Sequence, residues 1–171
     1  MLENSNLSSD FRHAMRRFAT TVSIVTCSCD WGWHGVTATT VVPVCIEPPT
    51  LLVCINQATL FYERLAGSGN FCINLLRSPH AEIARTFASR LTAPERFKRG
   101  GWSLFGYSPI LVDAQANLLC KTEMVTRFGT HGIFIGRVEA VRFAQDVDPL
   151  VYQDGQYVTT LQIPQRSSAA G

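Results

Sequence analysis

Residues 34–59 read HGVTATTVVPVCIEPPTLLVCINQAT, and this stretch decides the fold that we predict for the chain. Its first part, residues 35–41, is small, β-branched and nearly uncharged, which is typical of a strand. A later part, residues 51–55, is continuously apolar, as expected of a strand that is buried on both faces. Between them, Glu47-Pro48-Pro49 predicts an extended corner, because proline restricts the preceding residue and cannot donate to a ladder.

The two parts of this stretch suggest a binding site. A smooth strand at 35–41 forms a wall along which a flat ligand can approach the backbone closely. The second strand ends in a group of hydrogen-bonding side chains, Asn56, Gln57 and Thr59, at a predicted helix start. Such a group can bind phosphate, but the same residue types also serve as ordinary N-caps, and the sequence does not separate the two. We expect the wall to hold a planar cofactor and the loop to hold its anionic tail.

Composition favours one globular domain that acts on small molecules. The 171 residues are 46% hydrophobic and 16% charged, and the low charge leaves room for an apolar surface of the kind found at oligomer interfaces. The net charge of +2 comes from scattered basic residues, which argues against a nucleic-acid partner. The basic residues are nearly all arginine, and arginine suits bidentate contact with phosphate or carboxylate.

Cysteine usage and hydropathy predict a cytoplasmic protein with reduced thiols. None of the six cysteines forms a CxxC pair, and most lie in apolar runs, where a free thiol behaves as a small hydrophobe. The paired spacings of a zinc site are missing, so we expect no metal. There is no signal peptide and no uninterrupted apolar stretch of about 18 residues, so we expect no membrane segment.

The pattern along the chain predicts an antiparallel β fold with two or three peripheral helices. Polar, aperiodic ends (1–8 and 164–171) are expected to be frayed, which leaves a single domain at 9–163. Ser9 or Asp10 is the expected cap of a first helix that carries Phe11, Met15 and Phe18 on one face. Because strands mostly follow one another without helical crossovers, a closed or nearly closed barrel is the expected architecture. The remaining segments are strands at 20–26, 70–76, 118–126, 131–143, 150–152 and 156–160, helices at 59–66 and from Ser78, a helical turn at Pro94 and a loop at 100–113.

Few motifs carry chemistry. Gly67-Ser68-Gly69 precedes a strand and so is not a Rossmann loop, and neither a serine nucleophile elbow nor HExxH occurs. His131 begins a strand between Gly129 and Gly132, where glycines permit close approach of a ligand. Its imidazole can hydrogen-bond a flavin or nicotinamide group, or it can simply end a strand.

These blocks together resemble the short-chain flavin reductase family, the reductase components of two-component flavin monooxygenases such as the 4-hydroxyphenylacetate system. The resemblance covers about residues 11–157 in the family's order and spacing. It rests on FRHAMRRFATTVSIVT, GVTATTVVPV, EPPTLLVCIN, SGNFCINLL, EIARTFA, ERF, GTHGIFIGRV and LVYQDGQY.

The resemblance implies a split-barrel flavin-binding fold, a homodimer, and reduction of FMN or FAD by NADH or NADPH. It also implies a set of cofactor contacts, with His131 at the nicotinamide side. The implied contacts are Thr37, Ala38, Thr39 and Thr40 along the flavin ring, Asn56, Gln57 and Thr59 at the ribityl and phosphate, and Asn74, Arg85, Arg96 and Phe97 around the cofactor.

Three positions depart from the family's pattern. Pro43 replaces a usual serine, which removes one hydrogen bond expected near the ring. Thr130 stands where the family commonly has Asp before the histidine, and Glu95 replaces the Asp of Asp-Arg-Phe. Pro43 is the departure that bears on flavin positioning.

The implied reaction is hydride transfer from nicotinamide to flavin, with reduced flavin supplied to a partner monooxygenase. Positioning is the main task of such a protein, which agrees with the lack of an acid/base constellation. Three alternatives stay open: a same-fold reductase of a cobalt corrin or ferric iron, a non-catalytic flavin-binding barrel, and an oxidase of the pyridoxamine-phosphate type.

Overall fold

The structure, a computed structural model, describes residues 6–163, so residues 1–5 and 164–171 of the two ends expected to be frayed lie outside the described part. The helices are α1 (Leu7–Met15), α2 (Leu60–Ser68), α3 (Ala81–Ala88) and α4 (Ala93–Arg96), with a 3-10 turn η1 (Ser78–His80) before α3. The strands are β1 (Thr20–Thr21), β2 (Ser23–Cys29), β3 (Gly32–Ala38), β4 (Val41–Cys45), β5 (Thr50–Asn56), β6 (Asn70–Leu75), β7 (Trp102–Phe105), β8 (Ser108–Leu111), β9 (Ala116–Phe128), β10 (His131–Phe143), β11 (Val151–Gln153) and β12 (Gln156–Val158).

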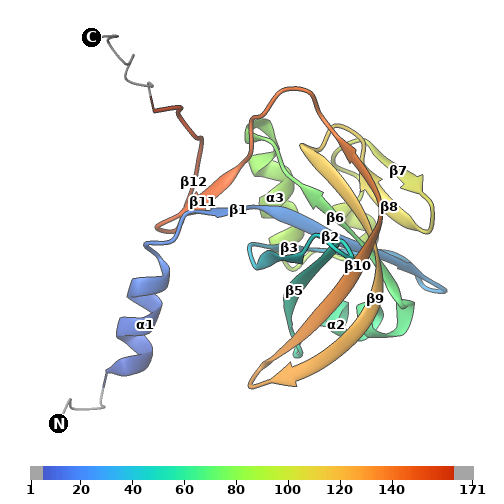
Figure 1. The fold of residues 1–171 in the computed structure, drawn as a ribbon, viewed down its shortest axis with the longest axis horizontal. Coiled ribbons are helices and arrows are strands. Elements are labelled where there is room, and N and C mark those ends of the chain that lie inside the picture. The colour runs from blue at the N-terminus through green and yellow to red at the C-terminus, as the bar shows by residue number, and fades with distance from the viewer. Residues whose placement is uncertain (1–5, 164–171) are drawn as a thin grey trace.

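The central feature is a seven-stranded antiparallel sheet in the order β3-β2-β6-β9-β10-β5-β4. Figure 1 shows it strongly curved, with the long strands β9 and β10 joined at one end by a tight turn. The predicted fold class, mainly β and antiparallel with peripheral helices, is confirmed. The sheet is not closed: β3 and β4, its two edge strands, follow each other in the chain but are not hydrogen-bonded to each other.

Two apolar clusters hold the helices on the sheet. One packs α2, through Phe61, Tyr62 and Leu65, against the inner side chains of the sheet. The other packs α3 against the start of β2, with Phe87 fully buried at its centre. Gly35 in β3 makes this possible, because a Cβ atom there would lie 2.7 Å from a ring carbon of Phe87.

The first helix, α1, stands apart from the sheet (Figure 1), and residues 7–18, which contain it, are called the arm below. It begins at Leu7 with Asn6 at the N-cap position, so the predicted cap at Ser9 or Asp10 is wrong by about one turn. Phe11 and Met15 lie in α1 as predicted, but Phe18 falls beyond the end of the helix, and none of the described side chains of α1 is buried. In Figure 1 the arm extends away from the sheet, joined to it through β1. β1 pairs with β11, which in turn pairs with β12.

The segment around residues 93–111 contains the other departure from the prediction. The helical turn expected at Pro94 is present as α4, and it brings the helices of the described residues to four. The segment predicted as a loop at 100–113 instead forms the hairpin β7-β8, in which Pro109 lies within β8. A proline is tolerated there because β8 pairs with β7 alone, so one of its edges needs no backbone donor.

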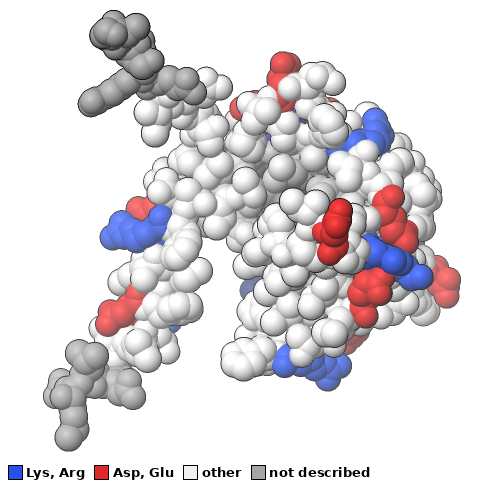
Figure 2. Space-filling view, in the orientation of Figure 1, with Lys and Arg blue, Asp and Glu red and all other residues white. Residues whose placement is uncertain are grey.

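The surface is mixed in charge. On the face drawn in Figure 2, basic and acidic side chains lie in small interspersed patches rather than in one field.

All six cysteines are unpaired, and Cys27, Cys72 and Cys120 are buried. None of the described helices combines the length and the apolar character needed to cross a membrane.

Candidate functional site

Three cavities lie in a row where the sheet is open. The central cavity, about 270 Å³, is lined by residues 36–40 and 54–56 with Thr59 and His131. The arginine cavity, about 400 Å³, shares Val36 and Thr59 with it. The arm cavity, about 310 Å³, shares Thr39 and Thr40 with it. The sequence-predicted wall, loop and histidine therefore meet around one space.

The wall, residues 35–41, begins in β3, a strand at one open edge of the sheet. β3 is hydrogen-bonded to β2 on one side, and no described strand pairs with its other side. An unpaired strand edge presents backbone N–H and C=O groups. Thr37 and Thr40 use their hydroxyls elsewhere, donating to the carbonyls of Ala84 (2.7 Å) and Cys54 (3.1 Å). The wall thus offers backbone groups and small side chains to a ligand, which suits a flat ring.

The loop after β5 forms the start of α2. The Thr59 hydroxyl donates to the Asn56 carbonyl at 2.8 Å and accepts from the Tyr62 N–H at 3.3 Å, so Thr59 is the N-cap of α2. The Asn56 side chain accepts from the Ala58 N–H at 2.9 Å. The positive end of the α2 dipole therefore opens on both the central and the arginine cavities, and such an end attracts anions. The capping and anion-binding interpretations that the sequence left open are compatible.

His131 is held at the mouth of the central cavity by the turn that joins β9 and β10. The Gln57 side chain donates to the carbonyls of Gly129 (3.2 Å) and His131 (2.9 Å), and its backbone N–H donates to the Thr130 carbonyl at 2.9 Å. The Thr130 hydroxyl lies 2.9 Å from Nδ1 of His131. Gln57 therefore supports the histidine and does not line the central cavity.

The glycines around His131 have roles in the turn and in packing. Gly129 adopts a φ of +54° in the turn, a conformation that favours glycine. A Cβ atom on Gly132 would overlap the ring of Tyr62. The glycine at 132 therefore makes room for the packing of α2 on β10, and close approach of a ligand to these glycines stays a prediction.

The arginine cavity contains residues that the sequence analysis did not single out, namely Ser89, Arg90 and Thr92. Arg96 also lines this cavity, and its guanidinium donates to the carbonyls of Gly35 (2.8 Å) and Ser89 (2.6 Å). Burial lowers the pKa of Arg96 from its ordinary value. Arg96 thus fixes the Ser89–Thr92 segment against β3. The only sign of this cavity in the sequence is a serine-arginine pair directly after a helix, and such a pair alone does not predict a binding site.

Four implied contacts lie outside the central and arginine cavities: Gln57, described above, and Asn74, Arg85 and Phe97. Asn74 is fully buried and donates to the Ile24 carbonyl and the Thr26 hydroxyl, both at 3.0 Å, while it accepts from the Leu111 N–H at 2.8 Å. Arg85 is exposed, pairs with Glu82 and lies over the ring of Tyr157. Phe97 packs its ring among Trp33, Phe87 and Trp102.

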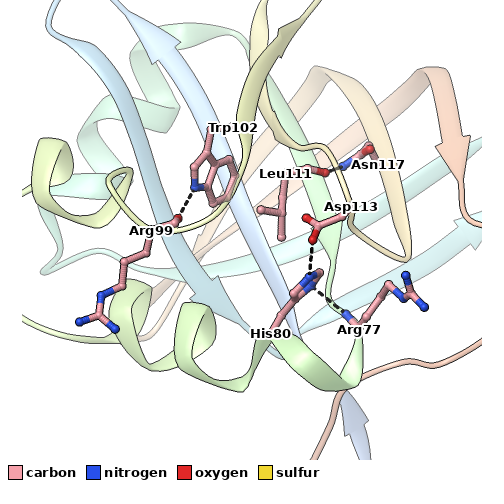
Figure 3. Close-up of polar contacts among 7 residues, drawn as sticks. All are labelled: Arg77, His80, Arg99, Trp102, Leu111, Asp113 and Asn117. Atoms are coloured by element: carbon pink, nitrogen blue, oxygen red, sulfur yellow. Dashed lines mark hydrogen bonds and ion pairs between the residues drawn. The ribbon is translucent and has the colours of Figure 1, made fainter.

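Figure 3 shows polar contacts of Leu111 and Asn117, both of which are hydrogen-bonded to Asn74, and of residues near them. Asn117 donates to the Leu111 carbonyl at 3.1 Å, and His80 lies 3.2 Å from the Asp113 carboxylate. Nδ1 of His80 accepts from the Arg77 N–H at 3.2 Å. Each of the groups named here has a protein partner, although Nε of Arg77 has none among the described residues, and such mutual bonding is the pattern of a structural network.

Pro43 lies in β4, the edge strand, and its side chain is exposed. An edge strand is where a sheet tolerates proline, because one side of the strand needs no donor. Pro43 is not among the residues that line the central cavity.

The central cavity has few groups that could exchange protons. Among the described residues that line it, only Cys54 and His131 carry a titratable side chain. Burial raises the pKa of Cys54, so this residue is a neutral thiol at neutral pH. Within the described residues, no group of three His, Cys, Asp or Glu side chains could hold a metal ion. The arrangement is suited to binding and orienting a flat molecule with an anionic tail.

Comparison with known proteins agrees with this arrangement. The family described as "Flavin reductase like domain" matches residues 15–161. The reductase component of the FADH2-dependent resorcinol hydroxylase of Rhizobium sp. (strain MTP-10005) is 33% identical over 91% of this chain and 89% of its own. An NADH-dependent FMN reductase of Methylorubrum extorquens, RutF 1, is 37% identical over 93% of this chain and 80% of its own.

A solved structure of a flavin reductase component also resembles this chain. The flavin reductase component of a bacterial two-component tryptophan halogenase superimposes with a TM-score of 0.83 at 29% identity, over 93% of this chain and 99% of its own. The match of the family over nearly the whole domain, together with these relatives, places the protein: it belongs to the flavin reductase family.

Proposed function

We propose that this protein is an NADH-dependent flavin reductase that transfers hydride to FMN or FAD and releases reduced flavin to a partner monooxygenase. The observation that carries the proposal is the convergence of the wall, the α2 start and His131 on one cavity. Relatives named as NADH-dependent FMN reductase and as a hydroxylase reductase component support the same activity.

The residues present fit a bound flavin. The wall at residues 37–40 would lie along the ring, and its free backbone groups would hydrogen-bond the ring's polar edge. The arginine cavity would take the phosphate through Ser89, Arg90 and the N–H groups at the start of α2. Asn56 would lie beside the ribityl chain between the two. We do not assign cofactor contact to Asn74, Arg85 or Phe97, which support the surrounding structure.

Flavin and nicotinamide supply the redox chemistry, and the protein's task is orientation. The side chains of the wall are small, so a flat ring would pack closely against it and water would be kept from that face of the ring. His131 would position the nicotinamide or the flavin, with Thr130 and Gln57 fixing its ring and its backbone. Alignment of two rings at reacting distance can account for a large share of the rate.

The proposed assembly is a homodimer. Leu7 and Phe11, in the first half of α1, are 66% and 63% exposed, and α1 itself extends beyond the sheet (Figure 1). Large apolar side chains exposed on a projecting helix are typical of an interface, and a second copy would cover them. Sedimentation equilibrium of the wild type should give twice the chain mass, and Phe11→Glu should shift the protein toward the monomer.

The second candidate function is a reductase that passes electrons to an acceptor other than flavin. It is supported only by the general chemistry of reduced flavin, which can pass electrons to many partners. The comparisons favour flavin, because the relatives are named for flavin and for flavin-dependent oxygenases. We place the reaction in the cytoplasm, in keeping with six unpaired cysteines.

The direct test is anaerobic stopped-flow absorbance with FMN, FAD and riboflavin against NADH and NADPH. We expect rapid loss of flavin absorbance near the rate of NADH oxidation, with FMN or FAD preferred over riboflavin because the phosphate has arginine partners. Slow reduction with all three flavins would contradict the proposal and favour a flavin-binding protein without this activity. The absorbance of the protein as purified distinguishes tightly held flavin from flavin that diffuses as a substrate.

A further inference from the structure

A small cavity, called the hairpin cavity below, lies at the end of the β9-β10 hairpin that is opposite its turn. Its volume is about 130 Å³, and it is lined by Arg77, Asn117 and residues 112–114 and 142–144. It shares no lining residue with the central, arginine or arm cavity. The space suffices for several water molecules, and so for a small ion such as phosphate.

The sheet brings two arginines to this cavity. Arg142 in β10 is paired with Asn117 in β9, so the two side chains lie on the same face of the sheet. Arg77 follows β6, whose last residue, Leu75, is paired with Ala116 at the same end of β9. Two arginines from separate segments of the chain therefore line one small space.

Neither arginine has an acidic partner. Among residues 6–163, no ion pair includes Arg77 or Arg142. Nε of Arg77 is buried and has no hydrogen-bond partner within the same range. In Figure 3 the dashed contact from His80 ends at the backbone N–H of Arg77, and the guanidinium extends away from His80. A buried charged donor without an acceptor is unfavourable, and a bound anion would supply the acceptor.

The guanidinium of Arg142 lies over an aromatic ring. Its Cζ is 5.8 Å from the centroid of the Phe105 ring. A guanidinium placed over a ring keeps the N–H groups at its edge available for hydrogen bonds. Such a planar fork matches the oxygens of a phosphate in bidentate fashion.

The acidic groups near the hairpin cavity do not cancel this charge. Asp113 is the one acidic residue among those that line it, and its carboxylate lies 3.2 Å from Nε2 of His80. The carboxylate of Asp148 accepts from the Ser78 hydroxyl at 2.5 Å, and neither Asp146 nor Asp148 lines the cavity. Two arginines against one aspartate leave a formal charge of +1 on the lining residues.

We propose that the hairpin cavity is an anion site that binds a phosphate group through Arg77 and Arg142. The phosphate is either free or part of a small monoester. The organic part of an ester would lie on the apolar rim, where Phe143 and Val112 are 72% and 49% exposed. This site is separate from the flavin site, and the inference does not depend on the proposed reductase activity.

The test titrates the protein with inorganic phosphate and follows the backbone amide signals by NMR, with sodium chloride adjusted to hold the ionic strength constant. The amides of residues 112–114 and 142–144 report the hairpin cavity, and those of Ser89 and Arg90 report the arginine cavity. Phosphate should shift the first group of signals along a saturating curve that gives a Kd. A second titration with phenyl phosphate separates the two sources, because tighter binding than that of phosphate indicates an ester, and equal or weaker binding indicates the free ion.

Arg142→Ala is the main variant, because Arg142 is exposed and its loss removes little packing. It should raise the Kd at the hairpin cavity roughly tenfold, the size expected for one lost charge-assisted contact. Arg77→Lys is the second variant, since lysine keeps the charge but loses Nε and the planar fork, and it should also raise this Kd. Arg99→Ala is the matched control, because it removes the same charge at an exposed residue that does not line the cavity, and its Kd should stay within about twofold of the wild type.

Three results would overturn the inference: no saturable shift at residues 112–114 and 142–144, the same Kd in Arg142→Ala as in the wild type, or an equal weakening in Arg99→Ala. Oxidation of NADH with FMN, measured on the same samples, tests the proposed function separately. Arg142→Ala should retain this activity. Its absence from the wild type would contradict the flavin reductase proposal and would leave the phosphate titration as valid as before.

Discussion

Polar residues lie at both ends of the long hairpin of β9 and β10, in its strands or in the elements beside it, and they serve different purposes. At the turn end, Asn56, Thr59 and His131 face the central cavity. At the other end, Asn74 and Asn117 are buried and bonded to each other at 2.9 Å and to their neighbours. The Thr59 hydroxyl is also satisfied within the protein, so the difference between the two ends is the cavity at the turn end, where the start of α2 and His131 can meet a ligand.

The largest effect is expected from a substitution at the turn end of the β9-β10 hairpin. His131→Ala should lower the turnover of flavin by roughly 100-fold, the loss typical of misplaced reacting groups, while the Kd for flavin changes less than about threefold. Turnover would be followed by NADH oxidation, and binding by flavin fluorescence. Equal loss of turnover and binding would assign His131 to flavin binding alone, and His131→Gln, which can still hydrogen-bond, should recover part of the rate.

The second largest effect is expected from a substitution at the opposite end of this hairpin. Asn74→Ala would leave the Leu111 N–H and the Asn117 amide without the buried acceptor that both now use. We expect a loss of about 3 kcal/mol in unfolding free energy and a fall of about 9 °C in Tm. Flavin affinity of the folded protein should be unchanged. Asn56→Ala is the comparison variant, with weaker flavin binding and a much smaller change in Tm, and the reverse pattern would contradict our division of the two ends.

A smaller effect concerns pH. Burial lowers the pKa of His34 below its ordinary value of 6.5, and the nearby Arg64 charge adds to this. The unfolded chain therefore binds a proton at a higher pH than the native protein does. Stability should fall as the pH drops below about 6.5, and should level off once native His34 is also protonated. The difference in Tm between about pH 7.5 and pH 5.5 should shrink in His34→Gln, and an unchanged difference would assign the pH dependence to other groups.

The smallest effect is expected at Pro43. Because this residue is exposed in the edge strand β4 and lies outside the central cavity, Pro43→Ser should change the Kd for flavin less than about twofold. Isothermal titration with FMN would check this. A clear gain in affinity would mean that the departure from the family's serine does affect the flavin ring.

Periodicity and composition predicted the strands and helices that form the site, because local patterns determine these elements. The clustering of the wall, Asn56, Thr59 and His131 followed from the family resemblance and is seen in the structure. Asn74 could not be placed in this way, because an asparagine in a strand looks the same whether its partners are a ligand or buried neighbours. The β7-β8 hairpin was missed because glycine and proline residues there are typical of a loop.

Gly132 illustrates a second limit. A glycine beside a site histidine suggests space for a ligand, yet the ring that requires this space belongs to Tyr62 in α2. Which distant side chain packs on a glycine depends on tertiary contacts that a single sequence does not display. Arg96 shows the same limit, since one of its carbonyl partners, Gly35, lies 61 residues away in the chain.

The attachment of the arm also bears on how the chain is made. Arg16 reaches Asp154, 138 residues later, and β1 pairs with β11. At about 5–20 residues per second of synthesis, these partners emerge on the order of 10 s after the arm itself. During that interval the partners of Arg16 and β1 do not yet exist, so the arm can be attached to the rest of the domain only near the end of synthesis.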